Sequence, residues 1–158
     1  MKEPPWLEPP ALEVVGLILA SHQAAFGRPL VAGTDPHRNL RLAAQEVFAV
    51  DQAVLAHDGS EDPRLIYANA AAIQLWRRPW AEMIGLPSRM TAEPEEQPGR
   101  AKALAFAQRQ DALAGYTGIR VDIEGRRFRI EGAKVWTFRD AGGKARGQAA
   151  GFSNWTLL

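Results

Sequence analysis

Histidines with nearby acidic residues are the first candidates for chemistry in this 158-residue chain. Imidazole and carboxylate groups bind metals and transfer protons when their spacing brings them together. The set consists of His22, His37, His57, Asp35, Asp51 and Asp58. Its spacing matches no metal-ligand pattern, and the neighbours Ser21 and His22 are not placed as nucleophile and base on one helix. The set therefore predicts neither a metal site nor a catalytic triad.

The chain contains no cysteine. Thiolate nucleophiles, disulfide bonds, cysteine-ligated zinc, iron–sulfur clusters and thiol adducts of a flavin are therefore excluded. The longest apolar run, residues 14–20, is shorter than the roughly 20 residues that span a bilayer. The first ten residues contain four prolines and place an acid where a signal peptide has a basic segment. These features predict a cytoplasmic protein that does not enter a membrane.

Arginine side chains offer two further candidate sites. Arg89 lies in a predicted loop, residues 87–98, where it could clamp a carboxylate or phosphate, or could form an ion pair that pins the loop. In residues 126–129, strand alternation places Arg127 and Arg129 on the outer face, where solvent or a carboxylate is the usual partner. Because the net charge is only +1, no nucleic-acid partner is expected.

Two helices are predicted ahead of the first strand. The first, residues 11–26, ends at Gly27, and a second begins at Asp35 as its N-cap with Pro36 in the first turn. The apolar stripe of the first helix consists of Leu12, Val15, Leu19 and Phe26. This stripe exceeds what one sheet face must bury, so we expect the N-terminal helices to form a dimer surface.

The middle of the chain alternates between strands and short helices. Residues 53–56 and 65–68 are short apolar runs joined by a cluster of turn formers, which predicts an antiparallel pair. Short helices follow at residues 70–76 and 79–84, the second closed by Gly85. A longer helix is expected over residues 99–114 with Leu104, Ala107 and Leu113 facing inward.

The last 43 residues predict three strands. Ile119, Val121 and Ile123 alternate with polar residues and are expected to face inward, and Glu124-Gly125 forms a hairpin turn. In the next strand Phe128 and Ile130 face inward, and a bulge near Gly132 keeps Lys134 out of the core. Residues 147–157 form the last strand. The fold class is therefore α+β: a five-stranded antiparallel sheet with helices on one face, preceded by two N-terminal helices.

This element order resembles a PAS domain, and a narrower set of motifs resembles the MEKHLA domain, a PAS-like module. The most specific motif is Leu86-Pro87-Ser88-Arg89-Met90-Thr91-Ala92-Glu93-Pro94. The other motifs are Leu55-Ala56-His57, Tyr67-Ala68-Asn69, Leu75-Trp76, Tyr116-Thr117-Gly118, Gly125-Arg126-Arg127-Phe128, Val135-Trp136 and Gly147-Gln148-Ala149-Ala150. The hexapeptide that names the family is absent. We divide the chain into a flexible proline-rich tail (residues 1–10), an N-terminal helical extension (11–48) and the PAS-like domain (49–158).

The resemblance implies a small-molecule pocket between the sheet and the helices. By position, the candidate pocket residues are Asn69, Trp76, Arg89, Tyr116, Phe128, Trp136 and Gln148. The alternative is that Trp76, Phe128 and Trp136 fill the core while Asn69 caps a helix. His57 falls on a family position and is expected to be a buried, hydrogen-bonded histidine.

No cofactor is predicted. PAS haem proteins take the ligand of the haem iron from a histidine on the long helix, and the corresponding helix here contains no histidine. The flavin–thiol adduct of a light-sensing PAS domain needs a cysteine, which this chain lacks. The glutamine that light-sensing PAS domains place near the end of the last strand is Phe152 here. A non-covalent small molecule is compatible with the sequence.

These observations predict a stand-alone PAS-like sensory, ligand-binding or protein-interaction module without an output domain. It would act through a homodimer formed by the N-terminal helices or through a separate protein partner. The alternative function is a small α+β enzyme that uses a pocket carboxylate, Asp51 or Glu131, as general base. No metal ion is part of either function.

Overall fold

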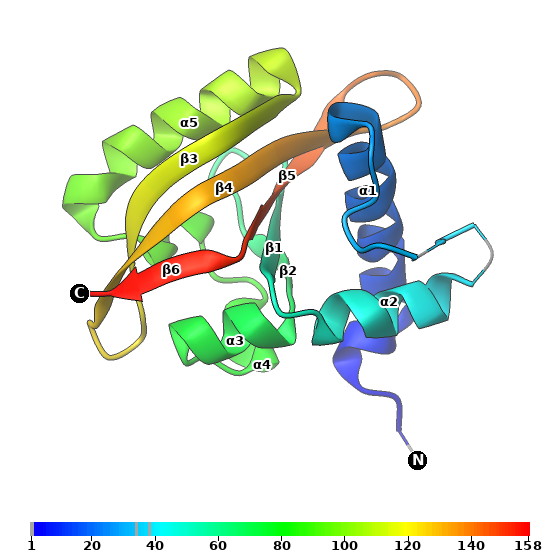
Figure 1. Ribbon diagram of the computed structural model, residues 1–158, viewed down its shortest axis with the longest axis horizontal. Coiled ribbons are helices and arrows are strands. Elements are labelled where there is room, and N and C mark those ends of the chain that lie inside the picture. The colour runs from blue at the N-terminus through cyan, green and yellow to red at the C-terminus, as the bar shows by residue number, and fades with distance from the viewer. Residues whose placement is uncertain (1, 34, 38) are drawn as a thin grey trace.

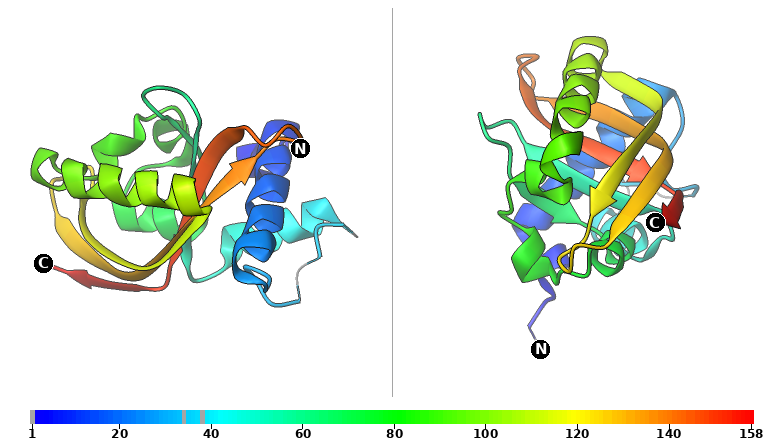
Figure 2. Two further views of the ribbon diagram at one scale, coloured as in Figure 1. Left: turned by 90° about the horizontal axis from the view of Figure 1, so that it is seen from above. Right: turned by 90° about the vertical axis from the view of Figure 1, so that its left-hand side faces the viewer.

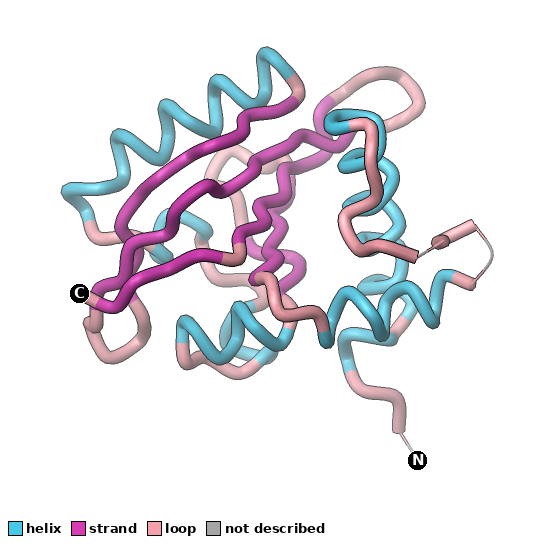
Figure 3. The backbone as a smooth tube through the Cα atoms, viewed as in Figure 1, coloured by secondary structure: helices cyan, strands magenta, loops and turns pink. Residues whose placement is uncertain are grey.

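The structure, a computed structural model, describes residues 2–33, 35–37 and 39–158. Its strands are β1 (Ala53–Asp58), β2 (Leu65–Ala68), β3 (Ala112–Val121), β4 (Arg127–Arg139), β5 (Ala145–Phe152) and β6 (Asn154–Leu157). They form one antiparallel sheet in the order β2-β1-β5-β4-β3, and β6 pairs with β4. The predicted α+β fold is confirmed, although the last predicted strand is interrupted at Ser153 between β5 and β6 (Figure 3).

Helices cover one face of this sheet, as predicted, and the first of the two N-terminal helices covers the other face. The α-helices are α1 (Pro9–Phe26), α2 (Leu40–Ala49), α3 (Ala70–Trp76), α4 (Trp80–Met83) and α5 (Gln97–Gln110), and the 3-10 helices are η1 (Pro5–Leu7), η2 (Ser88–Thr91) and η3 (Pro94–Glu96). Figure 1 shows α5 running alongside β3, and Figure 2 shows α1 on the opposite side of the sheet. The core is accordingly divided into one cluster beneath α1 and α2 and another beside α3.

Helix α1 packs its apolar stripe against the sheet of the same chain. Val15, Ile18 and Leu19 are buried, and the Trp136 indole Nε1 donates a hydrogen bond to the Ile18 carbonyl oxygen at 3.2 Å. The helix ends as predicted at Gly27, whose φ of 71° is the left-handed conformation that glycine adopts without strain. Of the stripe from which a dimer surface was expected, Val15 and Leu19 are buried within the chain, whereas Leu12 and Phe26 are only partly buried.

The start of α2 and the N-terminal segment differ from the prediction. Helix α2 begins at Leu40, and the Asn39 side chain caps it by accepting a hydrogen bond from the Leu42 N–H. Asp35 instead accepts a hydrogen bond from the His37 N–H, a local turn that competes with helix formation. Within residues 2–10, expected to be a flexible tail, Leu7 is buried and the Trp6 ring stacks on the Phe48 ring with centres 4.0 Å apart.

The hairpin between β3 and β4 is one residue out of the predicted register. Val121 pairs with Arg127 and Arg120 with Phe128, whereas a two-residue turn at Glu124-Gly125 would pair Val121 with Phe128. The longer turn is held by the Asp122 carboxylate, which accepts hydrogen bonds from the Glu124 and Arg126 N–H groups. A slip of one residue exchanges the two faces of a strand. Arg120 and Asp122 are therefore buried, while Ile123, predicted to face inward, is 44% exposed.

The predicted bulge near Gly132 is confirmed, and it decides which side chains face α5. Tyr116 pairs with Ala133 and Gly118 with Ile130, so β4 contains one residue more than β3 at this point. Beyond the bulge, Ala133 and Val135 continue the face of Ile130, while Trp136 turns toward α1. Lys134 lies over the Phe26 ring on the α1 side, 5.1 Å from its centre.

Helix α5 ends earlier than predicted. Asp111 adopts a left-handed conformation with φ of 66° directly after Gln110, so the helix stops there and not at Ala114. Leu113 is consequently part of β3, whereas Ala107 is buried on α5 as expected. The early turn places the whole length of β3 beneath α5, where its side chains help to line a cavity.

Candidate functional site

A cavity of about 60 Å³ lies between α5 and the sheet. Its wall is mostly apolar, with a few polar side chains from α5, β1, β3 and β5. It is lined by Leu55, Ala56, His57, Leu65, Trp76, Thr91, Arg100, Ala103, Leu104, Tyr116, Arg120, Ile130, Ala133, Val135, Gln148, Ala149, Ala150 and Phe152. Of the seven residues predicted for a pocket, the structure brings Trp76, Tyr116 and Gln148 together at this cavity.

Two of the remaining predicted residues lie in the packed core. Phe128 packs against Trp76, with ring centres 5.0 Å apart, and does not contribute to the cavity wall. Trp136 lies on the opposite face of the sheet, because the bulge at Gly132 reverses its direction, and its indole contacts His22 of α1. Phe128 and Trp136 therefore fill the core, as the alternative interpretation predicted.

Asn69 is a structural residue at the junction of β2 and α3. Its amide oxygen accepts hydrogen bonds from the Val54 and Ala72 N–H groups, and its amide nitrogen donates to the Val47 and Gln52 carbonyl oxygens. The side chain is fully buried, and it joins the end of α2, β1 and the start of α3. The predicted cap of the helix is therefore present, but Asn69 does not line the cavity.

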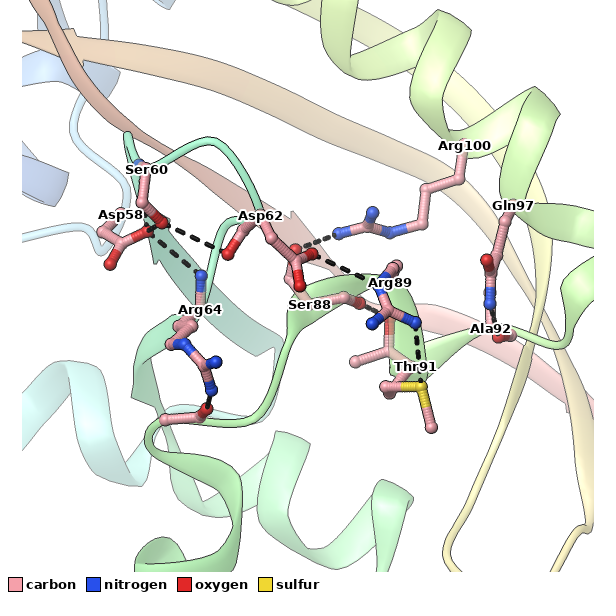
Figure 4. A network of polar contacts seen from close by, with 12 residues as sticks. Asp58, Ser60, Asp62, Arg64, Ser88, Arg89, Thr91, Ala92, Gln97 and Arg100 are labelled. Carbon is pink, nitrogen blue, oxygen red and sulfur yellow. Dashed lines mark hydrogen bonds and ion pairs between the residues drawn. The ribbon is translucent and has the colours of Figure 1, made fainter.

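Arg89 lies outside the cavity and forms an ion pair that pins its loop, as one of the two interpretations predicted. Its guanidinium Nε donates to the Asp62 carboxylate at 3.2 Å, which joins η2 to the β1–β2 loop. The side chain is 51% exposed, so this ion pair is screened by solvent. Figure 4 shows it beside the bond from Arg100 to the Ser88 hydroxyl.

An outer cleft adjoins the cavity. It has a volume of about 410 Å³ and lies between the β1–β2 loop, η2 and α5. His57, Arg100, Leu104 and Gln148 line both the cleft and the cavity. These four side chains therefore form the boundary between the cleft and the cavity.

Two arginines facing the cavity were missed by the sequence analysis. Arg120 on β3 is 6% exposed, and its guanidinium donates to the Tyr116 hydroxyl at 3.1 Å and to the Ile119 carbonyl oxygen at 2.9 Å. Arg100 on α5 is half-buried and donates to the Ser88 hydroxyl at 2.9 Å. Burial, and next the charge of Arg120, lower the pKa of Arg100 to about 10.

His57 is buried as predicted, and its ring has one unused nitrogen. Nδ1 donates to the Asp58 carbonyl oxygen at 2.8 Å, which leaves Nε2 as an acceptor with no partner among the described residues. Burial lowers the pKa of the imidazole, and the Arg100 guanidinium lowers it further. The neutral ring therefore presents a buried lone pair beside Arg100.

Acidic residues are absent from the cavity wall. Neither Asp nor Glu is among the described residues that line it. Asp51 lies in a separate groove beside α3, and Glu131 is exposed at the bulge, 4.0 Å from Arg129. The two carboxylates considered as general bases thus lie away from the cavity, and the described part of the chain holds no group of three metal-ligating side chains.

The sequence contained a signal for Arg120 but none for Arg100. Arg120 lies two residues before Asp122, and an aspartate followed by Glu124-Gly125 favours an Asx-type turn that starts earlier than the glycine. This turn would have given the correct register and the correct face for Arg120. Arg100 lies on a helix with only one fully buried residue, so its direction could not be derived from periodicity.

The comparisons with known proteins agree with this geometry. The family model described as MEKHLA domain matches residues 12–157, which include most of α1 and all of α2. The chain is similar to the PAS domain of a protein from Colwellia psychrerythraea, with a TM-score of 0.63 and 17% identity over 71% of this chain and 93% of that one. No curated protein matches the sequence.

Light-oxygen-voltage domains are also similar in fold. One described with a flavin analogue has a TM-score of 0.58 and 15% identity over 77% of this chain and 87% of that chain. Another, from a blue-light activated histidine kinase of Erythrobacter litoralis, has a TM-score of 0.55 and 20% identity over 69% of this chain and 97% of that chain.

None of the helices in the described part of the chain has the length and the apolar character that a membrane span requires.

Proposed function

Because the chain belongs to the MEKHLA domain family and has a PAS-like fold, we propose that it is a sensory module that recognises a small molecule beneath α5. The observation that carries this proposal is the cavity itself, an apolar hollow with a few polar groups on its wall that adjoins an outer cleft. Such hollows are the usual form of small-molecule sites. The unused Nε2 of His57 supports the same conclusion, since a ligand or water donor would satisfy it.

A flavin, as described for one similar structure, does not fit this cavity. Sites for ligands of that size have volumes of about 300–1,000 Å³, whereas the cavity measures about 60 Å³. The indole of Trp76 and the guanidinium groups of Arg100 and Arg120 form part of the wall that a ring system would have to displace. The proposed ligand is accordingly a much smaller molecule.

Helix α5 is the element proposed to report occupancy. Gln148 lines the cavity, and its amide nitrogen donates to the Leu104 carbonyl oxygen of α5 at 2.8 Å. A ligand that competes for this amide would change how α5 is held on the sheet. The change would be read by a separate protein or by a second copy of the chain. A homodimer through the N-terminal helices would use the side chains of α1 and α2 that are not buried within the chain.

Binding is tested on the full chain by nuclear magnetic resonance with a library of charged and neutral small molecules. A ligand of the cavity should shift the amide signals of β4, β5 and α5 and raise the melting temperature. Ala103→Leu, which adds volume from α5 into the cavity, should weaken binding at least tenfold. Ala24→Leu adds the same volume at an exposed position of α1 and should leave binding unchanged.

Two results would contradict the proposal. One is the absence of any library member that shifts the signals of the cavity wall. The other is binding that Ala103→Leu leaves unaltered, because the ligand would then lie elsewhere. Light scattering with and without ligand then reports on the second copy: a ligand-dependent change in mass supports signalling through a dimer, and a constant mass excludes it.

A further inference from the structure

We propose that the molecule recognised in this cavity is a small carboxylate with an apolar body, bound through its carboxylate by Arg100 and Arg120. The inference rests on the ligand-binding function proposed above and specifies the chemical class of the ligand. It follows from the charge, the hydrogen bonding and the size of the cavity, which are considered in turn.

The two arginines bring positive charge into the cavity without a counter-ion. The ion pairs among the described residues involve Arg41, Arg77, Arg89, Arg126, Arg127, Arg129 and Arg139 but neither Arg100 nor Arg120. Burying a guanidinium is costly unless an anion accompanies it. Since no acidic side chain of the described residues lines the cavity, the anion must come from outside the chain.

Most donors of the two guanidinium groups remain available. Each guanidinium has five N–H bonds in a rigid fork that matches a carboxylate. Within the described part of the chain, Arg100 uses one bond, to Ser88, while Arg120 uses two, to Tyr116 and Ile119. Both arginines line the same small cavity, so a carboxylate there could accept hydrogen bonds from both.

The rest of the wall favours an organic acid over an inorganic anion. Besides the polar groups, the wall contains the aliphatic side chains of Leu55, Ile130 and Val135 and the ring of Phe152. An inorganic phosphate would leave this apolar surface without a partner, whereas a short hydrocarbon chain would bury against it. The ligand therefore combines a carboxylate at one end with a hydrocarbon at the other.

The volume limits the length of the hydrocarbon. One water-sized position takes about 10–15 Å³ of such a volume, and the cavity measures about 60 Å³. This corresponds to roughly four to six water-sized positions. 2-Methylpropanoate, a branched carboxylate of about six non-hydrogen atoms, has this size and is the probe of choice.

The test is calorimetric titration of the full chain at pH 7.5 with 2-methylpropanoate, its uncharged amide 2-methylpropanamide, and inorganic phosphate. The acid should bind at least tenfold more tightly than either the amide or phosphate. Arg120→Gln should weaken binding of the acid at least tenfold. Arg89→Gln removes an exposed arginine at the rim of the outer cleft and should leave the affinity unchanged.

The outcomes separate this inference from the proposed function. If the amide binds as tightly as the acid and shifts the signals of the cavity wall, the cavity binds ligands but the assignment to carboxylates is wrong. If phosphate binds most tightly, the site recognises inorganic or phosphoryl anions, and the inference that the ligand has an apolar body is wrong. If Arg89→Gln weakens binding as much as Arg120→Gln, the anion lies in the outer cleft. The comparison of acid with amide uses the unaltered chain and stands even if Arg120→Gln does not fold.

Discussion

Asn69 shows how one buried amide can connect three elements. It uses both of its amide N–H groups and both lone pairs of its oxygen, so that it joins the end of α2, β1 and the first turn of α3. Each bond satisfies a backbone group that would otherwise be buried without a partner. Its position directly after β2 thus holds these three elements together at one buried side chain.

We expect Asn69→Ala to destabilise the fold by about 2–4 kcal/mol, because it leaves backbone donors and acceptors unsatisfied in the core. Urea denaturation measures the change. Asn39→Ala is the matched control, since Asn39 caps α2 at the surface with a single bond to the Leu42 N–H, and it should cost about 1 kcal/mol or less. Equal losses in the two variants would show that Asn69 acts only as a helix cap.

The arginines illustrate what residue type alone could and could not predict. Arg89 has the loop context of an anion clamp, yet it is exposed and paired with Asp62. Arg120 is the one arginine of β3, where alternation with Ile119 and Val121 predicted an outward direction, yet its side chain is buried at the cavity. The difference lies in which face of each element points inward, and for Arg120 that depends on a one-residue choice of turn.

Helix α5 is held to the sheet mainly by polar side chains of the strands. Ala107 is its only fully buried residue among those described, and Phe106 is 42% exposed. Three of its carbonyl oxygens accept hydrogen bonds from sheet side chains: Leu104 from Gln148, Ala107 from Thr137 and Gln108 from Arg139. A helix attached in this way can be displaced at low cost in buried apolar area, which suits an element that reports ligand occupancy.

We expect Thr137→Val to loosen α5, because the valine cannot donate to the Ala107 carbonyl oxygen. Amide exchange in α5 should accelerate by about 5- to 30-fold, which corresponds to about 1–2 kcal/mol for one buried hydrogen bond. Hydrogen–deuterium exchange read by nuclear magnetic resonance measures this per residue. Thr117→Val, at an exposed position of β3, is the control. Acceleration spread evenly over the sheet would mean general destabilisation and would contradict the role assigned to Thr137.

At the scale of the whole molecule, the sheet separates two buried histidines. His22 of α1 lies on one face, where its Nδ1 donates to the Arg28 carbonyl oxygen, and His57 of β1 lies at the cavity on the other face. Burial lowers the pKa of both imidazoles. The positive charges of Lys134 and Arg28 lower the pKa of His22 further, and the charge of Arg100 lowers that of His57 further. The nearby Asp58 carboxylate acts in the opposite direction on His57.

These shifts predict that the protein loses stability as the pH falls. In the unfolded chain an imidazole binds its proton near pH 6.5, whereas in the folded chain both rings stay neutral to lower pH. The unfolded state therefore takes up more protons below about pH 6.5, and the free energy of unfolding decreases by at most about 1.4 kcal/mol per pH unit for each ring. Urea titrations at pH 7.5 and 5.5 measure the change. In the double variant His22→Gln/His57→Gln the free energy of unfolding should decrease less between pH 7.5 and pH 5.5. If it decreases as much as in the unaltered chain, groups other than these two histidines cause the pH dependence.

The sequence by itself determined the fold class, most of the elements and the bulge. These were predicted from local signals, each of which acts over a few neighbouring residues. The signals are hydrophobic alternation, the turn residues after β1, Asn69 before α3, and the glycines at positions 27 and 132. The same local motifs carried the resemblance to the MEKHLA domain.

Only the tertiary structure decided which polar groups share the cavity. Arg100, Arg120 and His57 are brought together by the register of the β3–β4 hairpin, the early end of α5 and the packing of that helix over β3. Likewise, part of the apolar stripe of α1 is buried because β4 reverses its faces at Gly132 and presents Trp136 to it. These contacts join residues far apart in sequence, and their energies depend on burial, which no local pattern specifies.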